Sequence, residues 1–586
     1  MTTGISAEID DPSLQGRRTA QARIGDAATA AAPVFAGLRW LALGGLFALL
    51  VLKIAYAFEL KVNSDEPQHL HVVWAWTAGQ LPYRDLFDNH APLFQLLWSP
   101  LLALIGERGD IVEWMRLTVL PLYLACIWLT WRIGRSLWSG EVAFAAAAII
   151  AVYPVFFIVS TEFRPDDLWA LLWLATMLLL CGGRLDVRRG ACAGLAAGAA
   201  LAVSLKTLPL LLTAAFAAVI IALAMRRRGH PLAALPWPFL AAFAAAFLLV
   251  PAVLIGYFVA NGAGSTMYYA LLQHNLVADL GREEHEDLRF LVAPLTLPVA
   301  LWFAWRSRPT GNLVPWARRT FVLLAASGYL VAIYGYWPLF TPQDLLPVAP
   351  FFALAVAVAL LRVGTARYPA RGLRRAAVAA VLLIELVVLV GGYPLWEGHR
   401  GEFARRLEKV LALTRADDYV MDAKGDSIFR RRPIYWVLEG ITETRMRDGS
   451  IVDDIIERLA TTATPLVQPE RLPEADQQFV QANYLALDDD TLGGDISIAG
   501  QHLGAVAGGK PQSVAIAIPL EYTLISRDGP ARATIDGTPC SRACKLSAGT
   551  HSLVAERDGE LALVWAPALD RGVSAASLFP DAAPAR

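Results

Sequence analysis

The chain has 586 residues, of which 56% are hydrophobic and only 18% charged, and its mean hydropathy is +0.45. These values are typical of a protein that crosses a membrane many times and argue against an ordinary soluble one. The formal net charge of -1 gives no support for nucleic-acid binding. The sequence has no Walker loop, dinucleotide fingerprint or HExxH, so ATP-driven transport and cytosolic nucleotide-sugar chemistry also lose support.

The first segment, residues 1–36, is polar and alanine-rich. It lacks the compact charged-then-apolar layout of a cleaved signal peptide. We therefore expect a disordered cytoplasmic tail, followed by an uncleaved membrane anchor.

Apolar stretches near the 20 residues needed to cross about 30 Å of hydrocarbon follow this tail. We predict eleven spans, near 37–58, 114–131, 141–160, 167–182, 190–205, 207–225, 236–259, 289–305, 320–337, 345–362 and 375–394. Arginines cluster in alternate connections, which by the positive-inside rule places the N-terminus in the cytoplasm and the C-terminus outside. The predicted fold over 37–395 is thus a polytopic all-α bundle in a bacterial cytoplasmic membrane.

NSDEPQHLH opens the long first outer loop, which we predict over 59–113. Asp65 and Glu66 precede Pro67 there, and a structural interpretation explains all three, because proline suits a first helical turn and acids stabilise helix N-termini. It predicts a helix from Pro67 to Ala78. The functional alternative is a carboxylate at the membrane surface that activates a hydroxyl or holds a metal.

The sequence RPDD at 164–167 repeats this layout at the start of the fourth predicted span, on the same side. Ionisable groups at span ends usually face a bundle interior or an aqueous cavity, so Arg164 and Asp166 are candidate site residues. Lys206 interrupts a later apolar stretch. It is either a lysine that snorkels to the interface or a cation that holds a phosphate at headgroup level.

Three histidines lie in the first outer loop. His69 and His71, two positions apart, point to different faces of the expected helix, which suits shared metal binding poorly, so we predict that they are bystanders. His90 stands in DNHAPLF and is a candidate, although a loop histidine is more often inert than catalytic.

From about residue 396 the composition becomes mixed and polar, with no spanning segment, which predicts a soluble outer domain over 396–586 with a mixed α/β fold. Apolar positions in 449–460 have helical spacing. Asp558-Gly559 separates two apolar runs and predicts a hairpin, so we expect an antiparallel β module at the end. Cys540 and Cys544 can form a disulfide in an exported compartment, whereas zinc would need two further ligands.

The whole pattern resembles a known family. LPYRDLFDNHAPLFQLLWSPLLALIGE is similar to a first-loop sequence, and LFTPQDLLPVAPFFALA to a later segment, of the integral-membrane GT-C glycosyltransferases of the protein O-mannosyltransferase and aminoarabinose-transferase type. An acid pair, an outer-face RPD and a lysine at a span start occur in the same order. The resemblance covers about residues 40–395.

This resemblance implies a donor sugar on polyprenyl phosphate, used at the outer membrane face. By position, Asp65 matches the catalytic carboxylate with Glu66 beside it, and Asp166 matches the acid of the RPD element, so these three acids are the expected catalytic residues. Lys206 matches a lysine that faces the donor phosphate. Arg164 adds a second cation to that phosphate site.

Two departures from the family pattern concern the donor site. His90 stands where the family has the lysine of KPPL, and a protonated histidine there can still contact phosphate. Gln343-Asp344 replaces an Arg/His-Tyr pair.

The leading hypothesis is a glycosyltransferase that moves a sugar from a polyprenyl-phosphate donor to lipid A, an envelope glycan or a protein. One rival is a transporter or lipid flippase, which predicts charges near the bilayer midplane and an internal repeat. The other is a non-catalytic assembly scaffold. No cofactor is assigned, and the need for a divalent metal is left open.

Overall fold

The computed structural model describes residues 43–227, 236–276, 296–301, 313–337, 340–362, 371–399, 401–487, 496–540 and 542–579. The chain divides into two compact units, with the boundary after Tyr56. The first unit holds the start of a helix over 43–59. The second unit contains all the other elements and the whole of the site considered below. The predicted tail, 1–36, lies outside the described residues.

The first loop carries two helices, α2 (Asp65–Thr77) and α3 (Leu93–Ile105). The acids and Pro67 lie in the first turn of α2, as the sequence predicts. Gly79 and Gly106, with φ of +73° and +80°, follow the two helices, because a residue without a Cβ adopts this conformation at little cost. The loop therefore folds as two short helices rather than as an extended connection.

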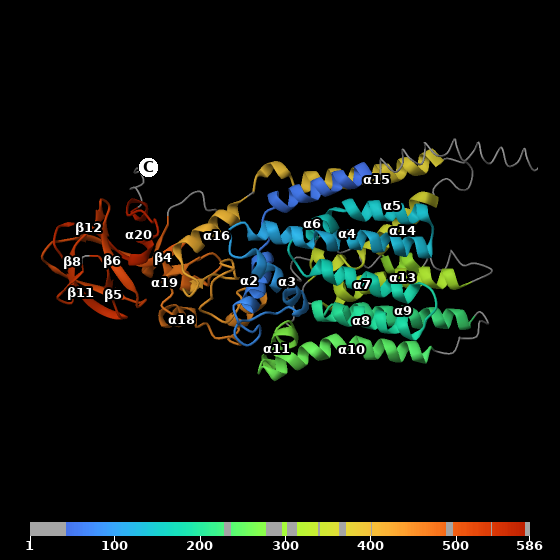
Figure 1. Cartoon of the computed structure of the whole chain (residues 1–586), viewed down its shortest axis with the longest axis horizontal. Helices are drawn as coiled ribbons and strands as arrows, with labels where there is room; N and C mark the ends of the chain where they lie inside the picture. The colour runs from blue at the N-terminus through green and yellow to red at the C-terminus, as the bar shows by residue number, and fades with distance from the viewer. Residues whose placement is uncertain are drawn as a thin grey trace, which may run out of the picture. The chain divides into compact units, whose positions relative to one another are not determined.

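Long apolar helices follow, and several run side by side (Figure 1). They are α4 (Ile111–Leu137), α5 (Gly140–Val152), α6 (Pro154–Val159), α7 (Asp166–Cys181), α8 (Val187–Val203), α9 (Thr207–Arg226), α10 (Trp237–Ala260), α13 (Val314–Tyr336), α14 (Ala349–Arg362) and α15 (Arg371–Gly392). Two shorter turns of helix, α11 (Gly264–Tyr268) and the π-helix η1 (Tyr269–Gln273), follow α10.

The predicted apolar segments fall on these helices, but the count of eleven spans is not confirmed. Four segments among the described residues are long and apolar enough to cross a membrane: Ile111–Leu137, Thr207–Arg226, Trp237–Ala260 and Gly372–Glu397. Proline breaks the predicted span 141–160 into α5 and α6, since Pro154 begins a new helix after Tyr153. Most of the predicted span 289–305 lies outside the described residues.

Helices α8 and α10 pack closely because glycines recur every four residues along α8. A Cβ added at Gly190, Gly194 or Gly198 would lie 2.1–2.4 Å from the carbonyl oxygens of Phe239, Phe243 and Phe247. Such spacing places the small residues on one helix face and lets two backbones approach. The end of α8 is thereby fixed immediately before the turn that carries Lys206.

The C-terminal domain is a mixed α/β domain built around two sheets. Its helices are α16 (Glu402–Leu413), α17 (Gly440–Arg447), α18 (Ile455–Thr461), α19 (Glu474–Asn483) and α20 (Ala566–Asp570). One sheet has the strand order β1-β2-β4-β12-β6-β10, with β3 on β4 and β7 on β6, and the other has the order β5-β11-β8-β9.

Every strand pair in these sheets is antiparallel except β1–β2, where Val420 lies opposite Leu466. The strands are β1 (Val420–Met421), β2 (Leu466–Val467), β3 (Tyr484–Ala486), β4 (Ser497–Val506), β5 (Pro511–Ile516), β6 (Glu521–Ser526), β7 (Gly529–Pro530), β8 (Ala533–Ile535), β9 (Thr538–Cys540), β10 (Cys544–Lys545), β11 (Gly549–Ala555) and β12 (Gly559–Trp565). The antiparallel module predicted at the end of the chain is present.

The predicted hairpin at Asp558-Gly559 is wrong. β11 pairs with β5 and β8, whereas β12 pairs with β4 and β6, so the chain passes from one sheet to the other at this turn. Both edges of β12 are occupied, which leaves no place for β11 beside it. The side chain of Asp558 instead accepts a hydrogen bond of 2.6 Å from the backbone N–H of Gly508.

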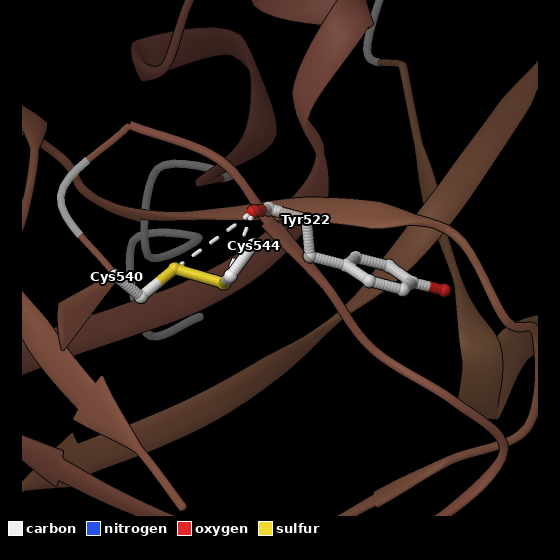
Figure 2. Close-up of a disulfide and its surroundings, with 3 residues drawn as sticks. All are labelled: Tyr522, Cys540 and Cys544. Carbon is white, nitrogen blue, oxygen red and sulfur yellow. Dashed lines mark hydrogen bonds between the residues drawn. A yellow bond between two sulfur atoms is a disulfide. The ribbon is translucent and has the colours of Figure 1, made fainter. Parts of the chain in front are cut away.

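The predicted disulfide between Cys540 and Cys544 is present (Figure 2). It joins the end of β9 to the start of β10, and both sulfurs lie near the carbonyl oxygen of Tyr522, at 4.0 and 3.4 Å. The buried free thiols Cys126 and Cys181 lie in apolar helices, as expected for ordinary packing.

Candidate active site

A cavity of about 370 Å³ lies where the first loop, the helix ends and the C-terminal domain meet. Its polar lining comes from α2, the loop between α2 and α3, the starts of α7 and α9, Asn275, residues 341–343 at η2 (Pro342–Leu345) and two loops of the C-terminal domain. Five of the six predicted site residues line it: Asp65, His90, Arg164, Asp166 and Lys206. They lie up to 141 positions apart in the sequence (206 minus 65), so only the tertiary fold brings them together.

Asp65, the first residue of α2, is the carboxylate at the centre of the charged wall. It accepts hydrogen bonds from Arg164 Nη1 at 2.8 Å and Lys424 Nζ at 2.5 Å, and 28% of its side chain is exposed. Burial alone would raise the pKa of Asp65, but the two cations outweigh burial and hold that pKa well below its usual value. Asp65 is therefore an ionised carboxylate that accepts hydrogen bonds readily and takes up a proton poorly.

Arg164 is a buried cation surrounded by three carboxylates. Beyond Asp65, its Nε lies 3.1 Å from Asp166 Oδ2 and its Nη1 lies 3.6 Å from Glu162 Oε2. Burial raises the pKa of Glu162 to about 7, against the opposing effect of Arg164. Asp166 is the first residue of α7. Its carboxylate is paired with the Arg164 guanidinium and so helps to hold that group in position.

Glu66 lies next to Asp65 in the sequence but does not line the cavity. Its fully buried carboxylate forms a two-point ion pair with Arg116, at 2.7 and 2.6 Å, and also accepts the backbone N–H groups of Asn63 and Phe163. Arg116 further donates to three backbone carbonyls of residues 57–61. This closed network ties the start of α2 to α4 and favours a structural role for Glu66.

Lys206 lies at the start of α9, on another wall of the cavity. Its ammonium group pairs with Asp344, whose buried carboxylate also caps η2 through Thr341. The ring of Trp337 lies 5.7 Å from the Lys206 ammonium group, within the range of a cation–π contact. Asp344 is one of the residues at which the sequence departs from the pattern of the similar family, and the structure places it as the counter-ion of Lys206.

His90 is held by a buried carboxylate. Asp88 Oδ1 lies 3.0 Å from His90 Nδ1 and accepts the His90 backbone N–H at 3.1 Å. His69, which was predicted to be a bystander, also lines the cavity, edge-on to His90 at 4.6 Å between ring centroids. Burial holds the pKa of His69 well below its usual value, so it is neutral. His71 instead hydrogen-bonds the carbonyl of Ile428.

Lys424 is the site residue that the sequence did not indicate. It belongs to the C-terminal domain, lines the cavity with a side chain only 9% exposed, and reaches Asp65 across 359 positions. The local run DAKGDS carries a glycine between polar residues, which signals a turn. No local pattern could show that this turn faces Asp65.

The described residues contain no group of three or more His, Cys, Asp or Glu side chains arranged to hold a metal ion. Asp65 and Asp166 are both engaged by Arg164. The carboxylates of the site are therefore paired with a cationic side chain of the protein.

Comparison with known proteins finds similarity to one family in part of the chain. Residues 89–255 match the sequence model of the family described as dolichyl-phosphate-mannose-protein mannosyltransferase. The matched segment includes His90, Arg164, Asp166 and Lys206 but begins after Asp65. The predicted resemblance to the integral-membrane GT-C glycosyltransferases that use polyprenyl-phosphate sugars is confirmed.

Among solved structures, the chain is similar to ArnT from Cupriavidus metallidurans bound to undecaprenyl phosphate, with a TM-score of 0.55 and 12% sequence identity over 78% of this chain and 98% of that one. The apo state of the same protein gives a TM-score of 0.54 and 15% identity over 79% and 98% of the two chains. At this identity the likeness shows a shared fold. No curated protein sequence matches the chain at a significant level.

Proposed function

We propose that this protein is a glycosyltransferase that moves one sugar from a polyprenyl-phosphate donor to an acceptor hydroxyl at the outer face of the cytoplasmic membrane. The observation that carries the proposal is that an ionised carboxylate, Asp65, lines the same cavity as the buried cations Arg164 and Lys424. Sugar transfer from a phosphate needs a group that orients the acceptor hydroxyl and positive charge for the departing phosphate.

Lys206, Arg164 and His90 form the proposed donor phosphate site. Lys206 begins α9, so the positive end of the helix dipole adds to its charge. Arg164 supplies a planar set of donors that suits phosphate oxygens. His90 stands where the family has a lysine, and its contact with Asp88 holds its ring at the cavity.

Asp65 is the proposed catalytic carboxylate, with Asp166 as the residue that positions Arg164. The lowered pKa of Asp65 favours orientation of the acceptor hydroxyl over removal of its proton. For Glu66, we assign a structural role in place of the predicted catalytic one, because its lone pairs are taken by Arg116 and two backbone N–H groups.

The choice of donor is supported by the similar ArnT structure, which holds undecaprenyl phosphate.

We further propose the finer topology: eleven spans over 37–395, the tail 1–36 in the cytoplasm, and the domain 396–586 outside. The acceptor is an envelope molecule with a free hydroxyl, namely lipid A, another glycan or a protein. A divalent metal at the donor phosphate is compatible with this chemistry and is tested by chelation.

The test is mass spectrometry of envelope lipids and glycoproteins from cells with and without the gene. The proposal predicts one species that loses a single sugar in the deletion strain and regains it when the intact gene returns. Accumulation of the unused polyprenyl-phosphate sugar in the same strain is expected as well. Identical envelopes in both strains, or a change in lipid distribution without any change in sugar content, would contradict the proposal and favour transport.

A further inference from the structure

The C-terminal domain contributes a charged side chain to the wall of the cavity. Lys424 Nζ lies 2.5 Å from Asp65 Oδ1, on the carboxylate oxygen that Arg164 does not use. Lys424 is as well shielded from solvent as Arg164, with side chains 9% and 7% exposed. A lysine is seldom buried without a specific partner, and Asp65 is the partner of Lys424 here.

The hydrogen-bonding capacity of Lys424 is not used up by the protein. Its ammonium group has three N–H donors, and two find acceptors, at Asp65 and, more weakly, at Ser64 Oγ at 3.4 Å. The third donor has no partner among the described residues. Because the side chain lines the cavity, this donor is available to an anionic ligand there.

The loop that presents Lys424 is held rigidly. Asp422 accepts hydrogen bonds from Gly425 N–H, at 2.5 Å, and from Ser427 N–H, at 3.0 Å, and forms an ion pair with Arg432 at 3.0 Å. Gly425 has φ of +99°, and a Cβ there would lie 2.7 Å from His71 Cβ. A larger residue would therefore push the loop away from α2, and with it the ammonium group.

We infer that Lys424 binds the donor phosphate together with Arg164, and that the C-terminal domain is for this reason an integral part of the catalytic site rather than an accessory. This inference rests on the proposed function and extends it. The ligand it assigns to the third N–H donor is a non-bridging oxygen of a polyprenyl phosphate.

The step that Lys424 assists is the departure of the phosphate. The bond between the sugar C1 and the phosphate oxygen breaks with its electron pair going to that oxygen, while the acceptor hydroxyl oxygen forms a bond to C1. The hydroxyl proton passes to the departing phosphate, whose second pKa is near 6. Lys424 keeps its own protons and donates a hydrogen bond to a non-bridging oxygen of the phosphate, over whose oxygens the developing negative charge is spread.

The experiment compares the full chain with Lys424→Met, Lys424→Arg and the control Lys510→Ala, which removes an exposed lysine from the same domain. Binding of undecaprenyl phosphate is measured on purified protein in nanodiscs. Transfer is measured in envelopes from the deletion strain, through the species that the mass spectrometry identifies. We expect Lys424→Met to bind the lipid about 10-fold more weakly and to transfer about 100-fold more slowly, with partial recovery in Lys424→Arg and no change in Lys510→Ala.

A pH profile separates a catalytic from a merely structural role. Asp65 faces Arg164, Lys424 and His69, and Lys424 is one of the groups that lower its pKa. Without Lys424 the pKa of Asp65 rises, so the acidic limb of the transfer rate moves to higher pH. Loss of a packing contact alone would leave that limb in place.

Three results would overturn the inference. Wild-type binding and transfer in Lys424→Met would remove Lys424 from the site while leaving the proposed function intact. A lowered melting temperature with an unmoved acidic limb, and no recovery in Lys424→Arg, would make the role structural. If the wild-type protein itself neither binds undecaprenyl phosphate nor transfers sugar, the proposed function fails first and the inference falls with it.

Discussion

Two clusters of ion pairs begin at adjacent residues of α2 and differ in one respect. In the first, Glu66 and Arg116 are almost fully buried and satisfy each other and the nearby backbone. In the second, Asp65, Arg164 and Lys424 also pair, but all three side chains line a cavity. The first cluster is closed, with its hydrogen-bonding groups used by the protein, whereas the second retains donors that face open space.

The difference shows that residue type and burial alone do not separate a structural carboxylate from a functional one. Glu162 lies between the clusters, 3.3 Å from Asn63 Nδ2 on the closed side and 3.6 Å from Arg164 on the cavity side. Asp65 differs from Glu66 because its partners, Arg164 and Lys424, line the cavity. The comparison therefore predicts that changes in the closed cluster affect folding and changes in the cavity cluster affect activity.

The largest effect is expected for Glu66→Ala. It leaves the buried Arg116 guanidinium without its carboxylate, which costs about 3–5 kcal/mol of unfolding free energy. We expect a large fall in melting temperature in detergent and little protein in the membrane. Glu141→Ala, which removes an exposed carboxylate from the first turn of α5, is the control and should stay within about 1 kcal/mol. A Glu66→Ala protein as stable as this control would show that the closed cluster does not stabilise the fold.

Asp65→Asn is expected to act on activity instead. Sugar transfer should fall on the order of 10³-fold, because the orienting charge is lost, while Arg164 keeps Asp166 as a partner and the melting temperature changes little. The matched control is Asp85→Asn, an exposed aspartate of the same loop that pairs with Arg84. Full transfer by Asp65→Asn would remove this carboxylate from the mechanism.

The raised pKa of Glu162 predicts that the stability of the protein depends on pH. Its folded pKa of about 7 lies above the usual 4.5, so the folded state holds the proton more tightly and stability falls as pH rises from 4.5 to 7. The decline should be on the order of 2 kcal/mol. Melting temperatures across this range should decline for the wild-type protein, and that decline should flatten in Glu162→Gln. Parallel curves for the two proteins would show that the carboxyl ionises freely.

The smallest effect on stability is expected when the disulfide between Cys540 and Cys544 is removed. Replacing Cys540 and Cys544 by serine opens a loop of about five residues, which by chain entropy costs about 2 kcal/mol in the β module. Limited proteolysis of this module should become faster, whereas transfer by folded protein should not change. A loss of transfer equal to that of Asp65→Asn would mean that the β module communicates with the cavity, which the comparison does not predict.

The sequence by itself determined the apolar helices, the start of α2 and the disulfide. Hydropathy predicted the apolar helices, proline and acids predicted the start of α2, and the close spacing of Cys540 and Cys544 predicted the disulfide, because each of these features depends on neighbouring residues. The resemblance to GT-C glycosyltransferases rested on the order of short motifs, and five of the six residues chosen from it line one cavity.

Only the tertiary structure decided what distant residues do to one another. It separated the roles of the adjacent acids Asp65 and Glu66, because Asp65 lines the cavity whereas Glu66 pairs with the buried Arg116. It paired β12 with β4 and β6, because strand partners depend on register and not on the nearest turn. It also brought Lys424 to Asp65, since a contact across 359 positions leaves no trace in local composition.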